Sequence, residues 1–220
     1  MVWLIFILVM VASYVVQATL SSRINKYSKV ATNFTGAQIA QMMLEQNGIH
    51  DVSITCISGT LTDHYNPQTK TVNLSQDVYN GNNLAAAAIA AHECGHVIQH
   101  ATGYAPLKLR TAAVPLVSFA NKSVQWILLL GIMILNLTPA MLWLGIALFA
   151  LTTAFSFITL PVEINASQRA VTWLRSANIT DSTTAAYASD ALKWAAYTYV
   201  IAALGSLATL LYYISIARRN

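Results

Sequence analysis

The chain has 220 residues, of which 56% are hydrophobic and only 9% are charged, and its formal net charge is +4. A soluble domain carries about 25% charged residues, so this composition, with a mean hydropathy of +0.53, argues against a soluble protein and predicts an integral membrane protein with one modest polar part. No basic run with interleaved aromatic residues occurs, so nucleic acid is not an expected partner. The two cysteines, Cys56 and Cys94, do not indicate a disulfide framework.

Residues 1–20 are predicted to be the first transmembrane helix. Val2 to Leu20 is almost continuously apolar and long enough to cross the roughly 30 Å hydrocarbon core. No Lys or Arg precedes this run, which a signal peptide would need. Although Val16-Gln17-Ala18 is a passable cleavage site, we expect an uncleaved anchor.

Residues 21–112 are predicted to form a small α+β domain. Thr35 and Gln38 have the spacing of a capping box, which opens a helix that stops at Asn47-Gly48. Two strands are then expected, at Val52–Ile57 and Lys70–Leu74, with turn residues at Asp63–Gln68 between them. We hypothesise that Lys70–Leu74 is an edge strand to which an extended substrate adds; a hairpin that only packs is the alternative.

The segment Leu84–His100 contains His92-Glu93-Cys94-Gly95-His96, which matches the motif H-E-x-x-H. Two imidazoles four residues apart lie on one helix face, where both can reach one metal ion, and the Glu beside them can act as a general base. The alanine-rich run before the motif, with Asn82-Asn83 as N-cap candidates and Gly103 beyond its end, predicts a helix here. The competing interpretation is two histidines that only pack in a core.

Three further spans are expected after this helix. Residues 113–160 should form a transmembrane hairpin, of which Ala140–Leu160 is a clean span of about 21 residues. A helix should start at Pro161, because proline is favourable at the first helical position, and residues 161–195 form a polar helical segment. Residues 196–217 are the fourth span.

A third metal ligand is needed, because a catalytic zinc ion takes three protein ligands and leaves its fourth position to water. His100 lies about 12 Å along the helix axis from His92, too far to share one ion. Glu163 is the only Glu after the motif, and two spans return it to the motif's side of the membrane. We therefore predict His92, His96 and Glu163 as zinc ligands; a carboxylate that only stabilises a helix start is the alternative for Glu163.

Three separate stretches carry a resemblance to a known family. They are Leu61-Thr62-Asp63-His64-Tyr65-Asn66-Pro67 with Val72-Asn73-Leu74-Ser75, Ala91-His92-Glu93-Cys94-Gly95-His96-Val97-Ile98-Gln99, and Leu160-Pro161-Val162-Glu163-Ile164-Asn165-Ala166-Ser167-Gln168-Arg169-Ala170. Together they resemble the YugP-like membrane zinc metallopeptidases (zinc peptidase family 2). The resemblance covers nearly the whole chain, and it implies a Zn²⁺ cofactor, metallopeptidase activity and a membrane-anchored catalytic domain.

The metal site also resembles that of the HtpX-type gluzincins, membrane peptidases whose third ligand opens an E-x-x-A-D run. This resemblance places Glu163 at the ligand position, while Ser167 stands where the family has Asp. That Asp would orient a ligand histidine. Asn165, Ser167 and Asp63 are the candidates for the role here.

The expected fold is a mainly α, four-helix transmembrane protein with a small α+β zincin-like catalytic domain facing one side of the membrane. The expected function is zinc-dependent metalloendopeptidase, with Glu93 as general base. An oxyanion donor or substrate contact is also needed, and the candidates are His64, Tyr65, Tyr104 and Arg169. Two alternatives stay open: a site-two-type intramembrane protease, although no L-D-G-like run occurs in a later span, and a non-catalytic zinc-stabilised scaffold, which would need a fourth ligand.

Basic residues are distributed unevenly between the two ends of the spans. Those on the motif's side are Arg23, Lys26, Lys29, Lys108, Arg110, Arg169, Arg175 and Lys193, and those on the other side are Arg218 and Arg219. The positive-inside rule then predicts an active site on the cytoplasmic side of a prokaryotic plasma membrane. The expected partners are a protein or peptide substrate and the lipid bilayer.

Overall fold

The computed structural model describes residues 2–218, and side chains from Leu4 onward. The elements in chain order are α1 (Val2–Tyr27), α2 (Gly36–Gln46), β1 (Ser53–Ile57), β2 (His64–Asn66), β3 (Thr71–Ser75), α3 (Gln76–Tyr79), α4 (Leu84–Ala101), α5 (Ala105–Met133), α6 (Ala140–Ser176) and α7 (Ser182–Ala217). Four helices, α1, α5, α6 and α7, are long and apolar enough to cross a membrane. The expectation of a mainly helical chain is therefore confirmed, and four of its helices have the length and composition of membrane spans.

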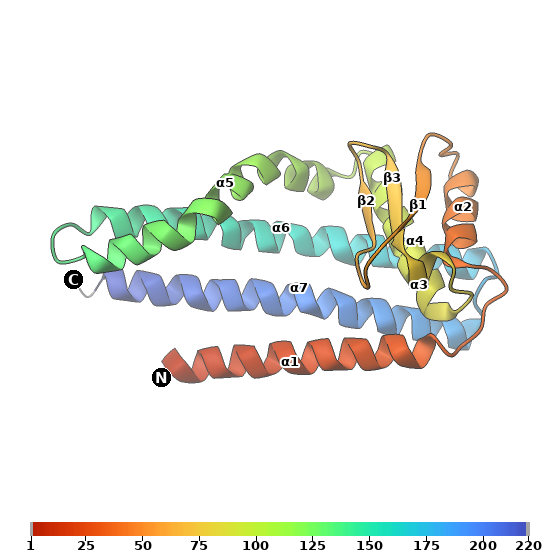
Figure 1. Ribbon diagram of the computed structural model, residues 1–220, viewed down its shortest axis with the longest axis horizontal. Coiled ribbons are helices and arrows are strands. Elements are labelled where there is room, and N and C mark those ends of the chain that lie inside the picture. The colour runs from red at the N-terminus through yellow and green to blue at the C-terminus, as the bar shows by residue number, and fades with distance from the viewer. Residues whose placement is uncertain (1, 219–220) are drawn as a thin grey trace.

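The long helices run side by side, and the smaller elements gather at one end of them (Figure 1). The sheet, α2, α3 and α4 lie at the end of the molecule where α1 ends, α6 ends and α7 begins. The hairpin loop between α5 and α6 lies at the opposite end, with the C-terminal end of α7. The start of α1 and the end of α7 therefore lie away from the sheet (Figure 1).

The polar elements follow several of the expected local signals. Thr35 and Gln38 form the predicted capping box at the start of α2. The Asn83 side chain accepts a hydrogen bond from the Ala86 amide and caps α4. Gly103, at the end of α4, has a φ of +65°, which glycine adopts readily. These caps fix where α2 and α4 begin and where α4 ends.

The sheet differs from the predicted hairpin. It has three strands in the order β1-β3-β2, with β1 and β3 parallel and β2 and β3 antiparallel. The hypothesis that Lys70–Leu74 is the edge strand is wrong, because β3 pairs on both sides. The edge nearer α4 is β2, which occupies part of the Asp63–Gln68 segment expected to be only a turn. A three-residue strand has too little alternation to be recognised from its sequence.

Three long helices also pass through expected boundaries or an internal proline. The sequence predicts a helix start at Pro161, but α6 continues through Pro161 without a break. Membrane helices tolerate an internal proline because neighbouring helices and local adjustments compensate for the missing hydrogen bond. Similarly, α5 contains Pro115, and α1 extends past Leu20 to Tyr27. Each membrane helix therefore continues into the polar layer.

The main core is centred on α4. Nearly every residue of α4 is buried, and its neighbours in this core come from α2, β3, α6 and α7. Its fully buried members include Met43, Val72, Val97 and Leu174. One core thus includes both the polar domain and the ends of two membrane-length helices, which is what brings α4 against α6.

Candidate metal centre

The two histidines of the motif lie on the face of α4 that packs against α6. Their rings are 4.8 Å apart between centroids and nearly perpendicular, at 86°. Cys94 points to the other side, where its thiol donates to the Ala40 carbonyl at 3.6 Å. Burial raises the pKa of this thiol, which keeps it protonated and unsuited to bind a metal.

A close approach between α4 and α6 depends on Gly95. A Cβ atom at this position would lie 2.6 Å from the Ala166 carbonyl oxygen, closer than side-chain atoms normally come. The small residue inside the motif therefore allows α6 to lie directly against the histidine face. Glu163, one turn before Ala166, is brought to the histidines in this way.

Glu163 meets both histidines with one carboxylate oxygen. Its Oε2 lies 3.4 Å from His92 Nε2 and 3.6 Å from His96 Nε2. The three possible ligand atoms all lie within 4.8 Å of one another, and the Glu163 side chain is only 4% exposed. Two imidazole nitrogens and one carboxylate oxygen are a donor set of catalytic zinc sites, so the residues fit the ion that the sequence predicts.

The outer nitrogens of both rings have partners. His92 Nδ1 lies 3.1 Å from Ser167 Oγ, so Ser167 is the candidate that contacts a motif histidine. His96 Nδ1 lies 3.1 Å from Gln99 Oε1. The fully buried Gln99 donates in turn to the Val162 carbonyl at 2.8 Å and to Asn165 Oδ1 at 3.1 Å. These contacts hold each ring with its Nε2 toward Glu163.

Several charged side chains surround the candidate metal centre and affect the ionisation of its ligands. Arg110 Nη1 lies 3.8 Å from Glu163 Oε1, the oxygen that does not face the histidines. Burial acts to lower the pKa of His96, but the hydrogen bond and charge of Glu163 and the charge of Glu93 outweigh it and raise the pKa. The surroundings thus attract a positive charge to the space between the histidines and Glu163.

Glu93 lies beside the three candidate ligands and is 8% exposed. Its Oε2 accepts a hydrogen bond from the Tyr65 backbone amide of β2 at 3.1 Å. Glu93, His92 and Glu163 line a common cavity of about 140 Å³. Most of the other residues around it are apolar and come from α1, α4, α7 and the loop before β2: Leu20, Ile24, Leu61, Ile89, Leu192, Ala195 and Ala196.

The four side chains predicted to contact the oxyanion or substrate are not among the residues that line this cavity. Two belong to β2: the His64 ring contacts the Thr62 carbonyl, and the Tyr65 hydroxyl lies 3.2 Å from His100 Nδ1. The other two lie where α4 meets α6: the Tyr104 hydroxyl donates to the Pro161 carbonyl, and Arg169 donates to Asn165. Of the four, only Tyr65 reaches Glu93, and it does so through its backbone.

Three residues at the candidate metal centre were not predicted from the sequence to take part in it. Gln99 could have been found, because it lies three residues after His96 on the same helix and such pairs are neighbours. Arg110 was counted only as a membrane-flanking charge, and Tyr199 only as part of the last span. Neither has a local motif, because each is brought to the centre by packing between distant helices.

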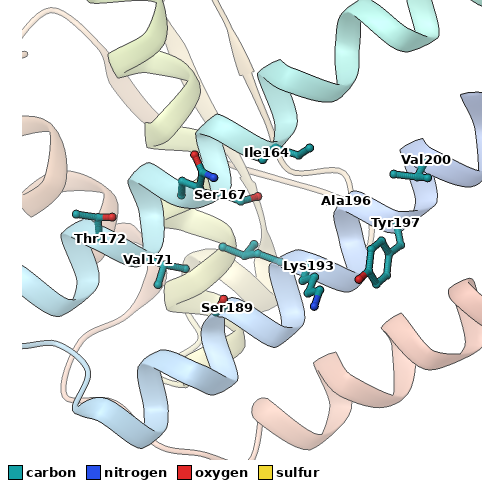
Figure 2. Close-up of a pocket in the computed structure, with 11 residues that line it drawn as sticks. Ile164, Ser167, Val171, Thr172, Ser189, Lys193, Ala196, Tyr197 and Val200 are labelled. Atoms are coloured by element: carbon teal, nitrogen blue, oxygen red, sulfur yellow. The ribbon is translucent and has the colours of Figure 1, made fainter.

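A second, larger hollow lies next to this centre. It is a groove of about 410 Å³ between α6 and α7, with apolar walls that include Ile164, Val171 and Val200 (Figure 2). Lys193 and Tyr197 of α7 also line it. The groove shares Ser167, Leu192 and Ala196 with the cavity beside Glu93.

Comparison with known sequences agrees with the predicted family. Residues 2–218 match a family described as "putative neutral zinc metallopeptidase". The chain belongs to this family. Among curated proteins, this zinc peptidase chain is 41% identical over 206 residues to the "Putative membrane protease YugP" of Bacillus subtilis (strain 168), covering 93% of this chain and 91% of the relative. No solved structure matches the chain.

Proposed function

We propose that this chain is a membrane-embedded zinc metalloendopeptidase with a gluzincin-type centre. The observation that carries the proposal is the convergence of His92 and His96 of α4 with Glu163 of α6, beside Glu93 in one cavity. The family supports zinc as the metal. Four membrane-length helices and the description of the relative as a membrane protease support the location in a bilayer.

In this proposal His92, His96 and Glu163 hold the ion. Zinc, when bound, would lower the pKa of a water molecule and polarise the scissile carbonyl. Glu93 acts as general base, takes the proton of the attacking water and later delivers it to the leaving amine. Ser167 and Gln99 keep the imidazoles oriented, and the apolar walls of the cavity limit access of bulk water.

The edge strand β2 offers a place for an extended substrate. It pairs with β3 on one side only, and the Tyr65 amide points toward Glu93 on the other. A substrate strand that adds to this edge would pass the general base, with its backbone held by hydrogen bonds. The preferred substrate would therefore be an unfolded or extended chain.

The decisive variant is Glu93→Gln, which keeps the size of the side chain and removes its basicity. We expect it to bind zinc like the wild type while cleavage of an unfolded protein falls to background. Zinc is measured by elemental analysis and cleavage by fluorescence of a labelled casein. Glu45→Gln, at an exposed site on α2, is the matched control and should cleave like the wild type. Equal cleavage by Glu93→Gln and wild type would refute the mechanism.

The two alternative functions, a site-two-type intramembrane protease and a non-catalytic zinc-stabilised scaffold, would each require a different structure. In site-two-type intramembrane proteases the motif helix crosses the membrane, whereas α4 packs among α2, the sheet and α6 and is not one of the four membrane-length helices. A structural zinc site is closed by four protein ligands, but three residues converge here among those that the structure describes. A substrate panel separates the first alternative: cleavage of transmembrane substrates alone would favour it.

We also propose that the centre faces the cytoplasm. The basic residues near the ends of the long helices are concentrated at the end that carries the sheet. Arg218 follows the C-terminal end of α7, which lies opposite the sheet (Figure 1). The positive-inside rule assigns the more basic end to the cytoplasm. A single cysteine introduced at the exposed Asp51 into a variant without Cys56 should resist a membrane-impermeant maleimide in intact cells. Labelling without lysis would reverse the assignment.

A further inference from the structure

The cavity beside Glu93 needs a hydrogen-bond donor for the reacting carbonyl oxygen, since peptide hydrolysis places negative charge on that oxygen. A positioned donor for such charge contributes about 10²–10³-fold to kcat. The donors predicted from the sequence do not line the cavity. Another group must therefore supply this hydrogen bond.

Two hydroxyl donors are found among the described side chains that line the cavity, Ser167 and Tyr199. The hydroxyl of Ser167 lies against His92 Nδ1 and is engaged there. The nearby Arg110 does not line the cavity, and its guanidinium faces Glu163 Oε1. By elimination, Tyr199 is the donor that can face a bound substrate.

Tyr199 reaches this position from α7, a different helix from those that carry the candidate ligands and Glu93. Tyr199 lines the same cavity as Glu163 and Glu93, and the charges of both carboxylates act on its phenol. The helix is held there by its packing against α1, α4 and α6. α7 is thus positioned by helices that also carry the candidate ligands, while Tyr199 itself is 39% exposed beside the cavity.

We propose that Tyr199 is a catalytic residue that donates its phenolic hydrogen bond to the carbonyl oxygen of the scissile peptide. This inference rests on the proposed peptidase function. The water oxygen bonds to the carbonyl carbon, its proton passes to Glu93, and the carbonyl π electrons move to the oxygen that Tyr199 contacts. When the C–N bond breaks, the amine takes the proton from Glu93 and the carbonyl re-forms. Tyr199 stays protonated throughout.

The test is Tyr199→Phe, which removes one oxygen atom and keeps the ring. We expect kcat to fall by about 10²–10³-fold, because the lost bond strengthens only as charge develops on the substrate. KM, zinc content and thermal midpoint should stay unchanged. Tyr197→Phe is the matched control: Tyr197 lies two residues earlier on α7 and lines the neighbouring groove (Figure 2), not the cavity beside Glu93. That control should retain the wild-type kcat.

A structural role would give a different pattern. If Tyr199 only packs, Tyr199→Phe should keep the wild-type kcat, and this result would overturn the proposal. A lowered midpoint or zinc content together with a lower kcat would also contradict it. Tyr199→His, which restores a donor, should recover part of the lost kcat, and equal kcat values for the His and Phe variants would count against a donor role.

The outcome for Glu93→Gln keeps this inference separate from the proposed function. If that variant is inactive while Tyr199→Phe cleaves like the wild type, the peptidase stands and Tyr199 is not its donor. If wild type and Glu93→Gln show the same cleavage, the proposed mechanism fails, and the role of Tyr199 fails with it.

Discussion

The two halves of α6 are parts of one continuous helix in very different surroundings. In the second half, which carries Glu163, Ala166 and Leu174 are buried, and Ala170 and Leu174 belong to the core around α4. In the first half, Leu142 and Ile146 pack against α5, while Trp143, Leu144 and Phe157 remain exposed. Exposed apolar side chains of this extent require a non-aqueous partner, here lipid. The difference shows that the candidate metal centre is built like the interior of a soluble domain.

The largest effect is expected for Gly95→Ala, which disturbs the packing of α4 against the second half of α6. The new Cβ would collide with the Ala166 carbonyl oxygen, which is backbone and cannot move aside easily. We expect a loss of about 1–3 kcal/mol of stability, and reduced zinc binding because Glu163 moves away. Thermal unfolding in detergent and zinc analysis measure both effects.

Gly205→Ala is the matched change in the membrane part of α7. There the Cβ would meet only Val9 Cγ1 at 3.0 Å, the end of a side chain that can adjust. Alanine also favours a helix over glycine by about 1 kcal/mol, so the midpoint should stay constant or rise. If both variants lost the same stability, the two regions would not differ in packing as described.

The next largest effect is expected for Gln99→Leu. This change removes the acceptor for His96 Nδ1 and the side-chain hydrogen bond that Gln99 donates to the buried Val162 carbonyl. Zinc affinity should fall about 10–100-fold, the usual consequence of losing a residue that orients a ligand. Chelator competition measures the affinity, and Gln168→Leu, at an exposed position of α6, serves as the control. An unchanged zinc affinity would show that Gln99 does not help to orient His96.

A smaller effect is expected for Ser167→Ala. Ser167 contacts His92 Nδ1, but it is less buried than Gln99, so a water molecule can replace the lost hydroxyl. We expect zinc affinity to fall by up to about tenfold, at the lower end of such effects. The same chelator competition should rank this variant between wild type and Gln99→Leu. A larger loss than for Gln99→Leu would reverse the order of importance.

The smallest effect is expected at the surface, for Asp51→Asn. The hydrogen bond and charge of Lys70 lower the pKa of Asp51, whose carboxylate lies 2.5 Å from the ammonium. A lowered pKa stabilises the fold above the usual pKa of Asp and loses that contribution as the pH falls. Because the pair is exposed, the midpoint at neutral pH should barely change, and any difference from wild type should vanish in acid. A difference in thermal midpoint that grows as the pH falls would contradict this pH dependence.

Local signals in the sequence predicted much of the architecture. The caps of α2 and α4, the strand β3 and the four membrane-length helices follow from residue spacing and hydropathy. The sheet order was not predictable, because β2 has only three residues and its partner is chosen by packing. The continuity of α6 through Pro161 also depends on neighbouring helices. Local propensity therefore located the elements better than their boundaries.

The candidate metal centre was also predictable from the sequence only in part. His92, Glu93 and His96 follow from a motif within one helix, and Glu163 follows from chain topology together with the need for a third ligand; the structure brings Glu163 to both histidines. Arg110 and Tyr199 come from helices with no motif of their own. Their approach is determined by the packing of α5 and α7, which sequence spacing does not encode.

The central claim is that one zinc ion held by α4 and α6 joins the polar domain to the membrane helices. The most direct test is the thermal midpoint of the wild type with zinc and after chelation, beside Glu163→Gln under the same conditions. We expect chelation to lower the midpoint of the wild type, because zinc bound only to the folded state stabilises that state. The midpoint of Glu163→Gln should change much less. An unchanged wild-type midpoint, or an equal change in both proteins, would contradict the claim.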